Sequence, residues 1–208
     1  MSEHYFTESP SSDAKQRELN LELGGHEVTV TTVGGTFSPT RLDLGTSVLL
    51  RHLPAPEPGN LLDLGCGWGP IALDAALNAK DAEVDVTVWA LDVNSRSLES
   101  TAANAKRLGL DSIKAVTAEQ IPADLQFTAI RSNPPIRVGK DALHDLLSTW
   151  IPRLAPGGRA DLVVSKNLGA DSLHRWLSET LGETFTVKRT GSSKGYRVLT
   201  IHRAQSSA

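Results

Sequence analysis

The 208-residue chain has little of what several protein classes require. It holds a single cysteine, Cys66, so it can form neither an internal disulfide nor a cysteine-based zinc site, and no metal site is predicted. No apolar run approaches the length that crosses a bilayer, and the first residues lack the basic and apolar regions of a signal peptide. No internal repeat is visible. These absences favour a cytoplasmic protein with no membrane association.

The net charge is small, but the charged residues are unevenly distributed along the chain. The formal net charge is −3; residues 1–130 carry 9 basic and 18 acidic side chains, whereas residues 131–208 carry 12 basic and 6 acidic ones. The acidic total argues weakly against a nucleic-acid partner, but a basic segment can form a local face that attracts phosphate. A solvated surface with uneven charge is the other interpretation.

Alternating strand and helix patterns begin at residue 59 and predict an α/β fold. Strands are predicted at 61–64, 84–91, 113–116, 128–132 and 160–164, and helices at 71–79, 96–108, 142–154 and 172–181. Two closing strands, 185–188 and 196–202, have no room for a helix between them and should pair antiparallel. We predict a Rossmann-like, seven-stranded, mostly parallel sheet with helices on both faces and an antiparallel last strand.

The chain is predicted to form one domain preceded by an arm. Residues 1–17 are polar and are expected to be flexible. Within the single domain, 18–205, the part at 18–58 contains a β-hairpin around Gly24 and Gly25 and a short helix that ends before Pro54. The Rossmann-like core follows at 59–205. No helical face is left conspicuously apolar, so a monomer is expected.

A glycine loop, Asp63-Leu-Gly65-Cys-Gly67-Trp-Gly69, joins the first core strand to its helix. Glycines allow the backbone to approach a ligand closely, and ligands of open α/β sheets lie at the carboxyl ends of strands. The spacing differs from the dinucleotide fingerprint, and the Asp63 carboxylate would repel a pyrophosphate but attract an ammonium. The predicted cofactor is therefore S-adenosylmethionine, with Asp63, Gly65 and Gly67 at its methionine part.

Acidic residues follow the next two strands. Asp92 ends the second core strand, where a carboxylate can accept both ribose hydroxyls; a turn or capping acid is the alternative. Glu119 follows the third strand, near the expected adenine amino group, and an exposed loop acid is an equally good interpretation.

The segment Ser-Asn133-Pro134-Pro135-Ile136 follows the fourth strand. Two prolines restrict the backbone and remove two donors, which leaves the Asn133 side-chain oxygen and the Pro134 carbonyl as acceptors. Two acceptors on a planar exocyclic amine favour its pyramidalisation and stabilise the positive charge that develops on nitrogen during methyl transfer. We assign Asn133, Pro134 and Pro135 to catalysis and also place Asn133 beside the cofactor. A Pro-Pro pair that only ends a strand is the alternative.

With these segments in place, the chain resembles the methyltransferase small-domain family of class I S-adenosylmethionine-dependent methyltransferases, which includes ribosomal RNA guanine-N2 methyltransferases. The resemblance covers about 27–203. Beside the segments above it includes Gly35-Thr36-Phe37-Ser38, Leu42-Asp43-Leu44-Gly45-Thr46 and Lys194-Gly195-Tyr196. It implies a Rossmann-like fold and packing of Phe37 and Thr46 against the methionine end and the target base.

The resemblance has three departures. Relatives that modify rRNA often have two tandem domains, many amino-methylating enzymes have an aromatic residue where this chain has Ile136, and the acidic total is unusual for an rRNA binder. Stacking is therefore assigned to Phe37, with Ile136 beside the substrate. A rim that contacts phosphate is predicted from basic residues after residue 130: Arg131, Arg137, Lys140, Lys166 and Arg197.

The predicted activity is methyl transfer to a nucleobase amine, with guanine N2 of ribosomal RNA as the favoured target and RNA as the partner. Alternatives are a protein-glutamine or adenine N-methyltransferase, a non-catalytic binding module with this fold, and a dinucleotide-dependent oxidoreductase. The glycine spacing and Asp63 argue against the last of these.

Overall fold

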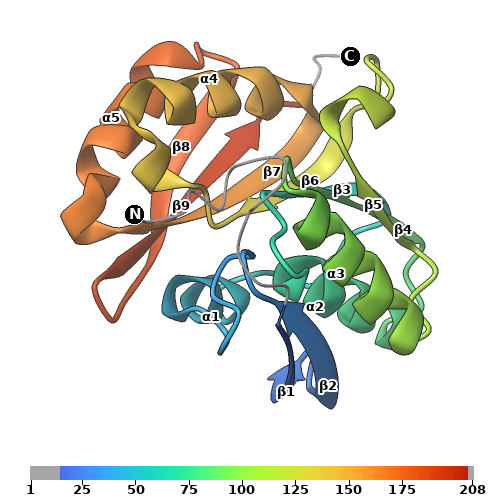
Figure 1. Ribbon diagram of the computed structural model, residues 1–208. Helices are drawn as coiled ribbons and strands as arrows, with labels where there is room; N and C mark the ends of the chain where they lie inside the picture. The colour runs from blue at the N-terminus through green and yellow to red at the C-terminus, as the bar shows by residue number, and fades with distance from the viewer. Residues whose placement is uncertain (1–14, 206–208) are drawn as a thin grey trace.

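A seven-stranded sheet forms the centre of the molecule in the computed structural model, which describes residues 15–205 (Figure 1). Its strand order is β5-β4-β3-β6-β7-β9-β8. The strands are β3 Gly59–Leu64, β4 Val86–Leu91, β5 Ile113–Val116, β6 Phe127–Ser132, β7 Leu154–Ser165, β8 Phe185–Ser193 and β9 Tyr196–Arg203. All neighbouring strands pair in parallel except β9, which is antiparallel to both β7 and β8. The predicted fold class is confirmed.

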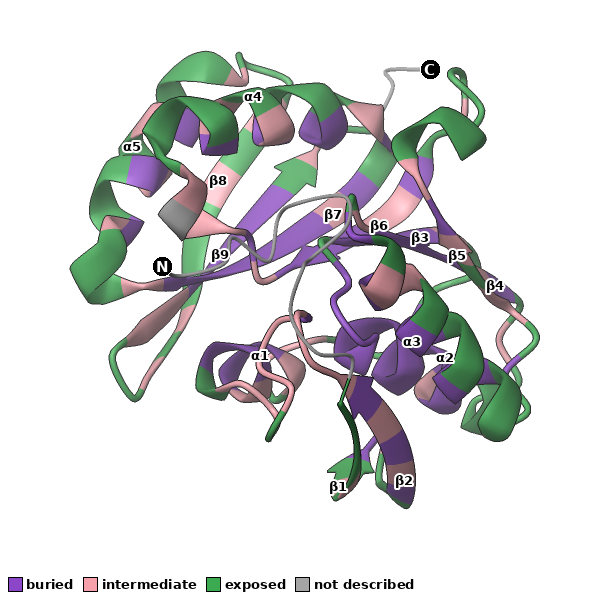
Figure 2. Ribbon diagram, viewed as in Figure 1, coloured by how far each residue is buried: buried purple, intermediate pink, exposed green. Residues whose placement is uncertain are grey.

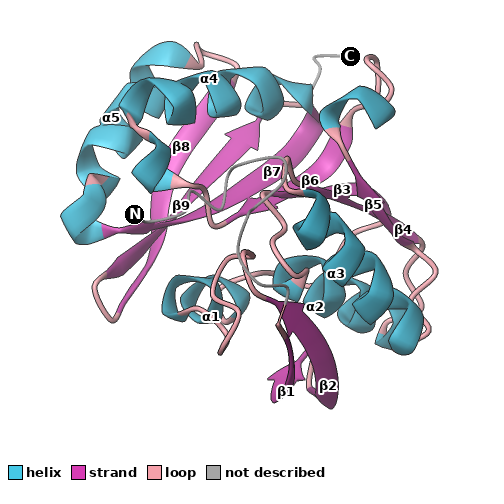
Figure 3. Ribbon diagram, in the orientation of Figure 1, coloured by secondary structure: helices cyan, strands magenta, loops and turns pink. Residues whose placement is uncertain are grey.

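Helices cover both faces of this sheet (Figure 3). One face carries α1 Leu44–Leu50, α2 Pro70–Asp81 and α3 Ser95–Arg107, and the other carries α4 Lys140–Trp150 and α5 Ala170–Thr180. The alternation of β3 explains this division, because Leu62 and Leu64 pack into the core under α4 and α5 while Leu61 packs toward α2. Figure 2 shows buried residues on the strands and on the inward helix faces.

The predicted amino-terminal hairpin forms a separate two-stranded sheet of β1 Gln16–Leu23 and β2 His26–Val33. Asn104 of α3 holds it, because its Oδ1 accepts from Thr31 N at 2.7 Å and its Nδ2 donates to Thr31 O at 2.9 Å. These two bonds satisfy the backbone N–H and C=O of Thr31 on β2, and Ser100 Oγ also donates to Thr31 O at 3.3 Å. β1 begins at Gln16, inside the predicted arm; the rest of that arm, residues 1–14, lies outside the described residues.

Within residues 15–205, four short 3₁₀ helices connect the longer elements. They are η1 Ala118–Gln120, η2 Ile136–Val138, η3 Ile151–Arg153 and η4 Lys166–Leu168. The helix predicted at 142–154 begins two residues earlier and ends at Trp150, because Pro152 cannot continue the α-helical hydrogen bonding. β7 therefore begins at Leu154, earlier than predicted.

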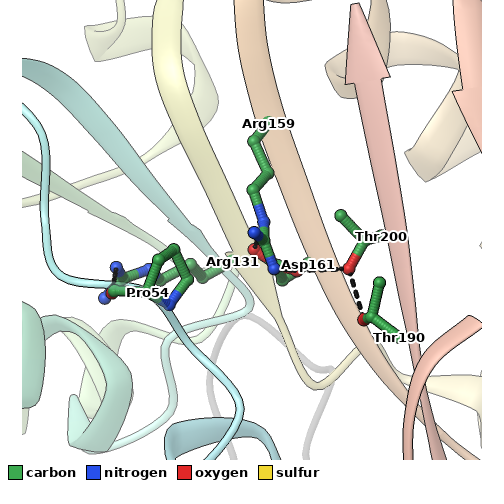
Figure 4. A network of polar contacts seen from close by, with 6 residues as sticks. All are labelled: Pro54, Arg131, Arg159, Asp161, Thr190 and Thr200. Atoms are coloured by element: carbon green, nitrogen blue, oxygen red, sulfur yellow. Dashed lines mark hydrogen bonds and ion pairs between the residues drawn. The ribbon is translucent and has the colours of Figure 1, made fainter. Parts of the chain in front are cut away.

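A partly buried polar network connects the middle strands (Figure 4). Asp161 accepts from Arg159 Nε at 2.7 Å and from Thr200 Oγ1 at 2.6 Å, and Arg131 donates to the Pro54 carbonyl at 3.2 Å. Arg131 is only 3% exposed and aligns with Asp63 in the sheet, so its assignment to a phosphate rim was wrong. Strand β6 alternates too, and Arg131 points into the protein, where burial lowers its pKa and the nearby carboxyl groups of Asp74 and Asp161 oppose that lowering.

Candidate functional site

The three loop glycines after β3 have positive φ for different reasons. Their φ angles are 80° at Gly65, 58° at Gly67 and 94° at Gly69, all in the region that favours glycine. A Cβ on Gly65 would meet no atom within 4 Å, whereas one on Gly69 would lie 2.9 Å from Thr101. Gly69 thus allows tight packing on α3, and Gly65 exposes its backbone to an open space.

Asp92, which follows β4, lies beside this loop and accepts a hydrogen bond from it. Its Oδ2 accepts from Gly67 N at 2.9 Å and its Oδ1 accepts from Asn94 N at 2.9 Å, so the carboxylate fixes the loop and the start of α3 together. Burial raises the pKa of Asp92, and the backbone hydrogen bonds oppose that rise. Val93 N–H and the Ser97 side chain also hydrogen-bond to this carboxylate and lower its pKa, and its predicted contact with two ribose hydroxyls stays a prediction.

Asp63 lies behind the loop and is fully buried. Its Oδ2 accepts from Ala72 N, a free donor of the first turn of α2, at 3.0 Å. Its Oδ1 is buried without a hydrogen-bond partner among the described residues. Burial raises the pKa of this carboxyl to about 8. A cationic ligand group would compensate it; its predicted contact with an ammonium stays a prediction, because Asp63 does not line the neighbouring cavity.

A first cavity opens beside the glycine loop and is about 180 Å³ in volume. It has a polar wall and a largely apolar wall, and its lining includes Phe37, Gly65, Gly67, Asp92, Val93, Ser97, Ala118, Asn133, Pro135, Leu146 and Trp150. The part that Leu146 and Trp150 of α4 play here was not foreseen from the sequence. Their helical spacing indicated only a core face, and Trp150 does belong to the core as well.

Asn133 follows β6 and projects between two cavities. Its Nδ2 donates to Asp43 Oδ2 at 2.9 Å and to Thr46 Oγ1 at 3.0 Å. A carboxylate only accepts hydrogen bonds, so the side facing Asp43 must be the NH₂ group. No described residue donates to Asn133 Oδ1, which therefore remains available as an acceptor.

The two prolines shape the backbone beside Asn133 into a tight turn. Pro135 has φ −74° and ψ 72°, and Pro134 O accepts from Ile136 N at 2.8 Å, which is the geometry of an inverse γ-turn. The Pro134 carbonyl keeps one lone pair for another donor. Asn133 Oδ1 and Pro134 O are thus two acceptors on consecutive residues, as predicted.

A second cavity, of about 400 Å³, shares Phe37 and Asn133 with the first. Its other lining residues come from the loop before α1, from the Pro-Pro turn and η2, from the end of β7, from η4 and from the start of β9: Ser38, Asp43, Pro134, Ile136, Ser165, Leu168 and Tyr196. Sequence reasoning did not assign Ser165, Leu168 or Tyr196 to the site. Adjoining cavities that meet at one amide suit a reaction between two bound molecules.

The remaining predicted site residues lie around these cavities. Thr46 is buried and contacts Asn133, and Ile136 lines the second cavity. Glu119 is exposed on η1 and lines neither of these cavities, although Ala118 beside it does. Lys140 is exposed at the start of α4, and Arg137 lies in η2.

Two features are absent among residues 15–205. No group of three or more His, Cys, Asp or Glu side chains there has the arrangement that holds a metal ion. Nor is any of the described helices both long and apolar enough to cross a membrane.

Comparisons with known proteins agree with this geometry. The profile of the family described as "Methyltransferase small domain" matches residues 27–200. The uncharacterized protein YbxB of Bacillus subtilis is 32% identical over 203 residues, which cover 96% of this chain and 98% of that protein. Ribosomal RNA small subunit methyltransferase C of Pseudomonas aeruginosa is 33% identical over 200 residues, covering 94% of this chain and 57% of that enzyme. The chain thus spans little more than half the length of this RNA methyltransferase.

A solved structure shows the same architecture. RsmC of T. thermophilus, a 16S rRNA N2 methyltransferase determined in complex with AdoMet and guanosine, aligns with a TM-score of 0.76 at 25% identity. The alignment covers 90% of this chain and 50% of that one. TrmN from Thermus thermophilus aligns with a TM-score of 0.56, also at 25% identity, over 77% of this chain and 48% of that one.

Proposed function

The chain belongs to the methyltransferase small-domain family, and on this basis we propose that it methylates an exocyclic nucleobase amine, specifically guanine N2 of ribosomal RNA. S-adenosylmethionine is the cofactor of this family, and it is the ligand of the related RsmC structure. The residues of the first cavity fit it, because the backbone at Gly65 is open and the Asp92 carboxylate lines the cavity. Behind the glycine loop, outside the cavity lining, Asp63 has a buried oxygen without a hydrogen-bond partner among the described residues, and this oxygen suits an ammonium.

The orientation of the Asn133 amide carries the proposal. With both Nδ2 hydrogens donated to Asp43 and Thr46, only Oδ1 can face a substrate, and it accepts from an amine rather than donating to a carbonyl. The Pro134 carbonyl accepts the second amine hydrogen. Together they hold the nitrogen with its lone pair directed at the methyl group.

The chemistry then needs little from the protein beyond position and electrostatics. When bound, S-adenosylmethionine supplies a methyl group activated on a sulfonium. As the nitrogen–carbon bond forms and the sulfur–carbon bond breaks, positive charge develops on nitrogen, and the two acceptor oxygens stabilise it. Neither an amide nor a peptide oxygen is an effective base, so the amine proton leaves to water.

Two features favour a nucleic-acid substrate, and the first of them supports guanine in ribosomal RNA. RsmC of T. thermophilus holds guanosine in its structure, and the relative from Pseudomonas aeruginosa is a ribosomal RNA methyltransferase. Lys166 and Lys194 are exposed beside residues that line the second cavity, and Lys166 N donates to Gly195 O at 2.8 Å, so both lysines lie on chain segments at its edge. We assign these lysines to phosphates that flank the target.

The experiment is methyl transfer from radiolabelled S-adenosylmethionine, with naked 16S and 23S rRNA, ribosomal subunits, DNA and a peptide-release factor as separate substrates. Label in RNA that is recovered as N2-methylguanosine after nuclease digestion supports the proposal. Recovery as a methylated adenine or in protein glutamine favours the alternative amine substrates. No transfer to any of them, from a folded protein that binds the cofactor, favours the binding-module interpretation.

A further inference from the structure

Asp43, the residue that precedes α1, accepts one of the two hydrogen bonds that the Asn133 side chain donates. Asp43 has φ −60° and ψ 144°, and its Oδ2 accepts from Thr46 N at 3.0 Å, which makes it the N-cap of α1. The same Oδ2 accepts from Asn133 Nδ2 across 90 residues of sequence. One carboxylate oxygen therefore connects the start of a helix to the side-chain amide of Asn133.

The neighbouring residues leave Asn133 one orientation. If the amide rotated by 180°, Oδ1 would face the Asp43 carboxylate, and the two hydrogen bonds from Nδ2 would be lost. Thr46 Oγ1 is the second acceptor and is itself buried, so it has few alternative partners. The carboxylate also strengthens its hydrogen bond by charge, which polarises the amide and increases the negative character of Oδ1.

The short segment Asp43-Leu44-Gly45-Thr46 is built for this arrangement. A Cβ on Gly45 would lie 2.8 Å from the Tyr196 ring and 3.0 Å from Asp43 Oδ2. A side chain at Gly45 would therefore displace either the ring that lines the second cavity or the carboxylate. One helical turn thus holds the capping carboxylate of Asp43, the glycine at 45, which leaves room for that carboxylate, and the acceptor hydroxyl of Thr46.

We propose that Asp43 is a positioning residue that holds the Asn133 amide with Oδ1 toward the acceptor amine and raises the acceptor strength of that oxygen. The inference rests on the proposed function for its catalytic consequence. Its structural part, the orientation of the amide, can be measured without any substrate.

Three variants separate orientation from folding. Asp43→Ser keeps an N-cap, because serine also accepts from the N3 amide, but its hydroxyl is too short to reach Asn133. Asp43→Asn keeps an acceptor for both donors and removes only the charge. Asn133→Ala identifies the Asn133 side-chain NH₂ signals in the ¹⁵N spectrum of this 22.3 kDa chain by their loss.

The spectrum tests the structural part. We expect the Asn133 NH₂ protons to lie downfield in the wild type, to move upfield in Asp43→Ser, and to fall between these positions in Asp43→Asn. Unchanged Asn133 signals in Asp43→Ser would overturn the proposal, even if the wild type transferred no methyl group and the proposed function had failed.

Single-turnover methyl transfer tests the catalytic part. Asp43→Ser should lower the rate on the order of 10–100-fold, because small misplacements of a reacting group cost about this much, while the cofactor dissociation constant stays within about twofold. Asp43→Asn should recover part of the rate. In an Asn133→Ala background, Asp43→Ser should cost little more, since the two residues act as a unit. An equal loss in both backgrounds would show that Asp43 does not act through Asn133.

Discussion

The buried carboxyl of Asp63 should make the stability of the protein depend on pH. Burial raises the pKa of Asp63 from 3.8 to about 8, although the hydrogen bond from Ala72 N–H offsets part of the rise. Between these two values the folded chain holds a proton that the unfolded chain has lost. Each pH unit in that window lowers the free energy of unfolding by about 1.4 kcal/mol, so raising the pH from 5 to 7 costs about 3 kcal/mol.

Asp63→Asn isolates this effect. The amide keeps an acceptor for Ala72 N–H and cannot titrate. When the pH is raised from 5 to 7, the wild type should therefore lose about 3 kcal/mol of unfolding free energy relative to the variant. This is a large share of the roughly 5–15 kcal/mol that stabilises a typical domain.

Urea denaturation followed by tryptophan fluorescence at pH 5, 6 and 7 measures these free energies. Asp111→Asn, at an exposed aspartate, is the matched control. Its unfolding free energy should change with pH as that of the wild type does. If the unfolding free energy of Asp63→Asn also changed with pH as that of the wild type does, Asp63 would be ionised in the folded protein. The reasoning from burial would then be refuted.

Three further predictions concern the ligands. Gly65→Ala places a methyl group in the first cavity and should weaken S-adenosylmethionine binding at least about tenfold, or about 1.4 kcal/mol. Calorimetric titration measures this affinity. Gly182→Ala, which also has positive φ and open space around it, is the control and should leave the affinity unchanged. Asp92→Ala should weaken it by at least about as much, because the carboxylate holds the loop as well as the proposed ribose; unchanged affinity would remove that role. The double variant Lys166→Ala, Lys194→Ala should raise KM for RNA and leave the cofactor affinity unchanged. The slope of log affinity against log salt concentration should become shallower by about one ion for each lysine. An unaltered slope would exclude both lysines from the phosphate contacts.

The sequence predicts the order of the elements well because their patterns are local. The strand at Ile113–Val116 was predicted with its bounds as found, and the positive φ of the loop glycines follows from their place between β3 and α2. The antiparallel last strand followed from chain length alone, since no helix fits between 188 and 196. The insertion of β9 between β7 and β8 did not, because neighbouring positions in a sheet depend on contacts across the whole domain.

Side-chain environments were harder to predict. Arg131 belongs to a basic segment, but the alternation of β6 and the carboxylates around it place it inside the protein. Arg197 is also a poor candidate for a free phosphate contact, because it forms an ion pair with Asp171. A count of charges along the chain carries no information about the direction in which each side chain points.

The candidate site shows the same limit. Asn133 and the prolines were found from a contiguous motif, whereas the orientation of the amide depends on Asp43, which lies 90 residues earlier. The cavity-lining role of Trp150 was hidden by its membership of the core face of α4. Only the folded chain brings these residues together.

The central claim is that Asn133 Oδ1 holds the acceptor amine and takes no essential part in binding the cofactor. Its most direct test compares Asn133→Ala with the wild type, by calorimetric titration with S-adenosylmethionine and by single-turnover methyl transfer to the RNA substrate. We predict a methyl-transfer rate that falls on the order of 100-fold or more, with cofactor affinity within about threefold of the wild type. A variant that retains its transfer rate, or one that loses cofactor affinity in proportion to its activity, would contradict the account.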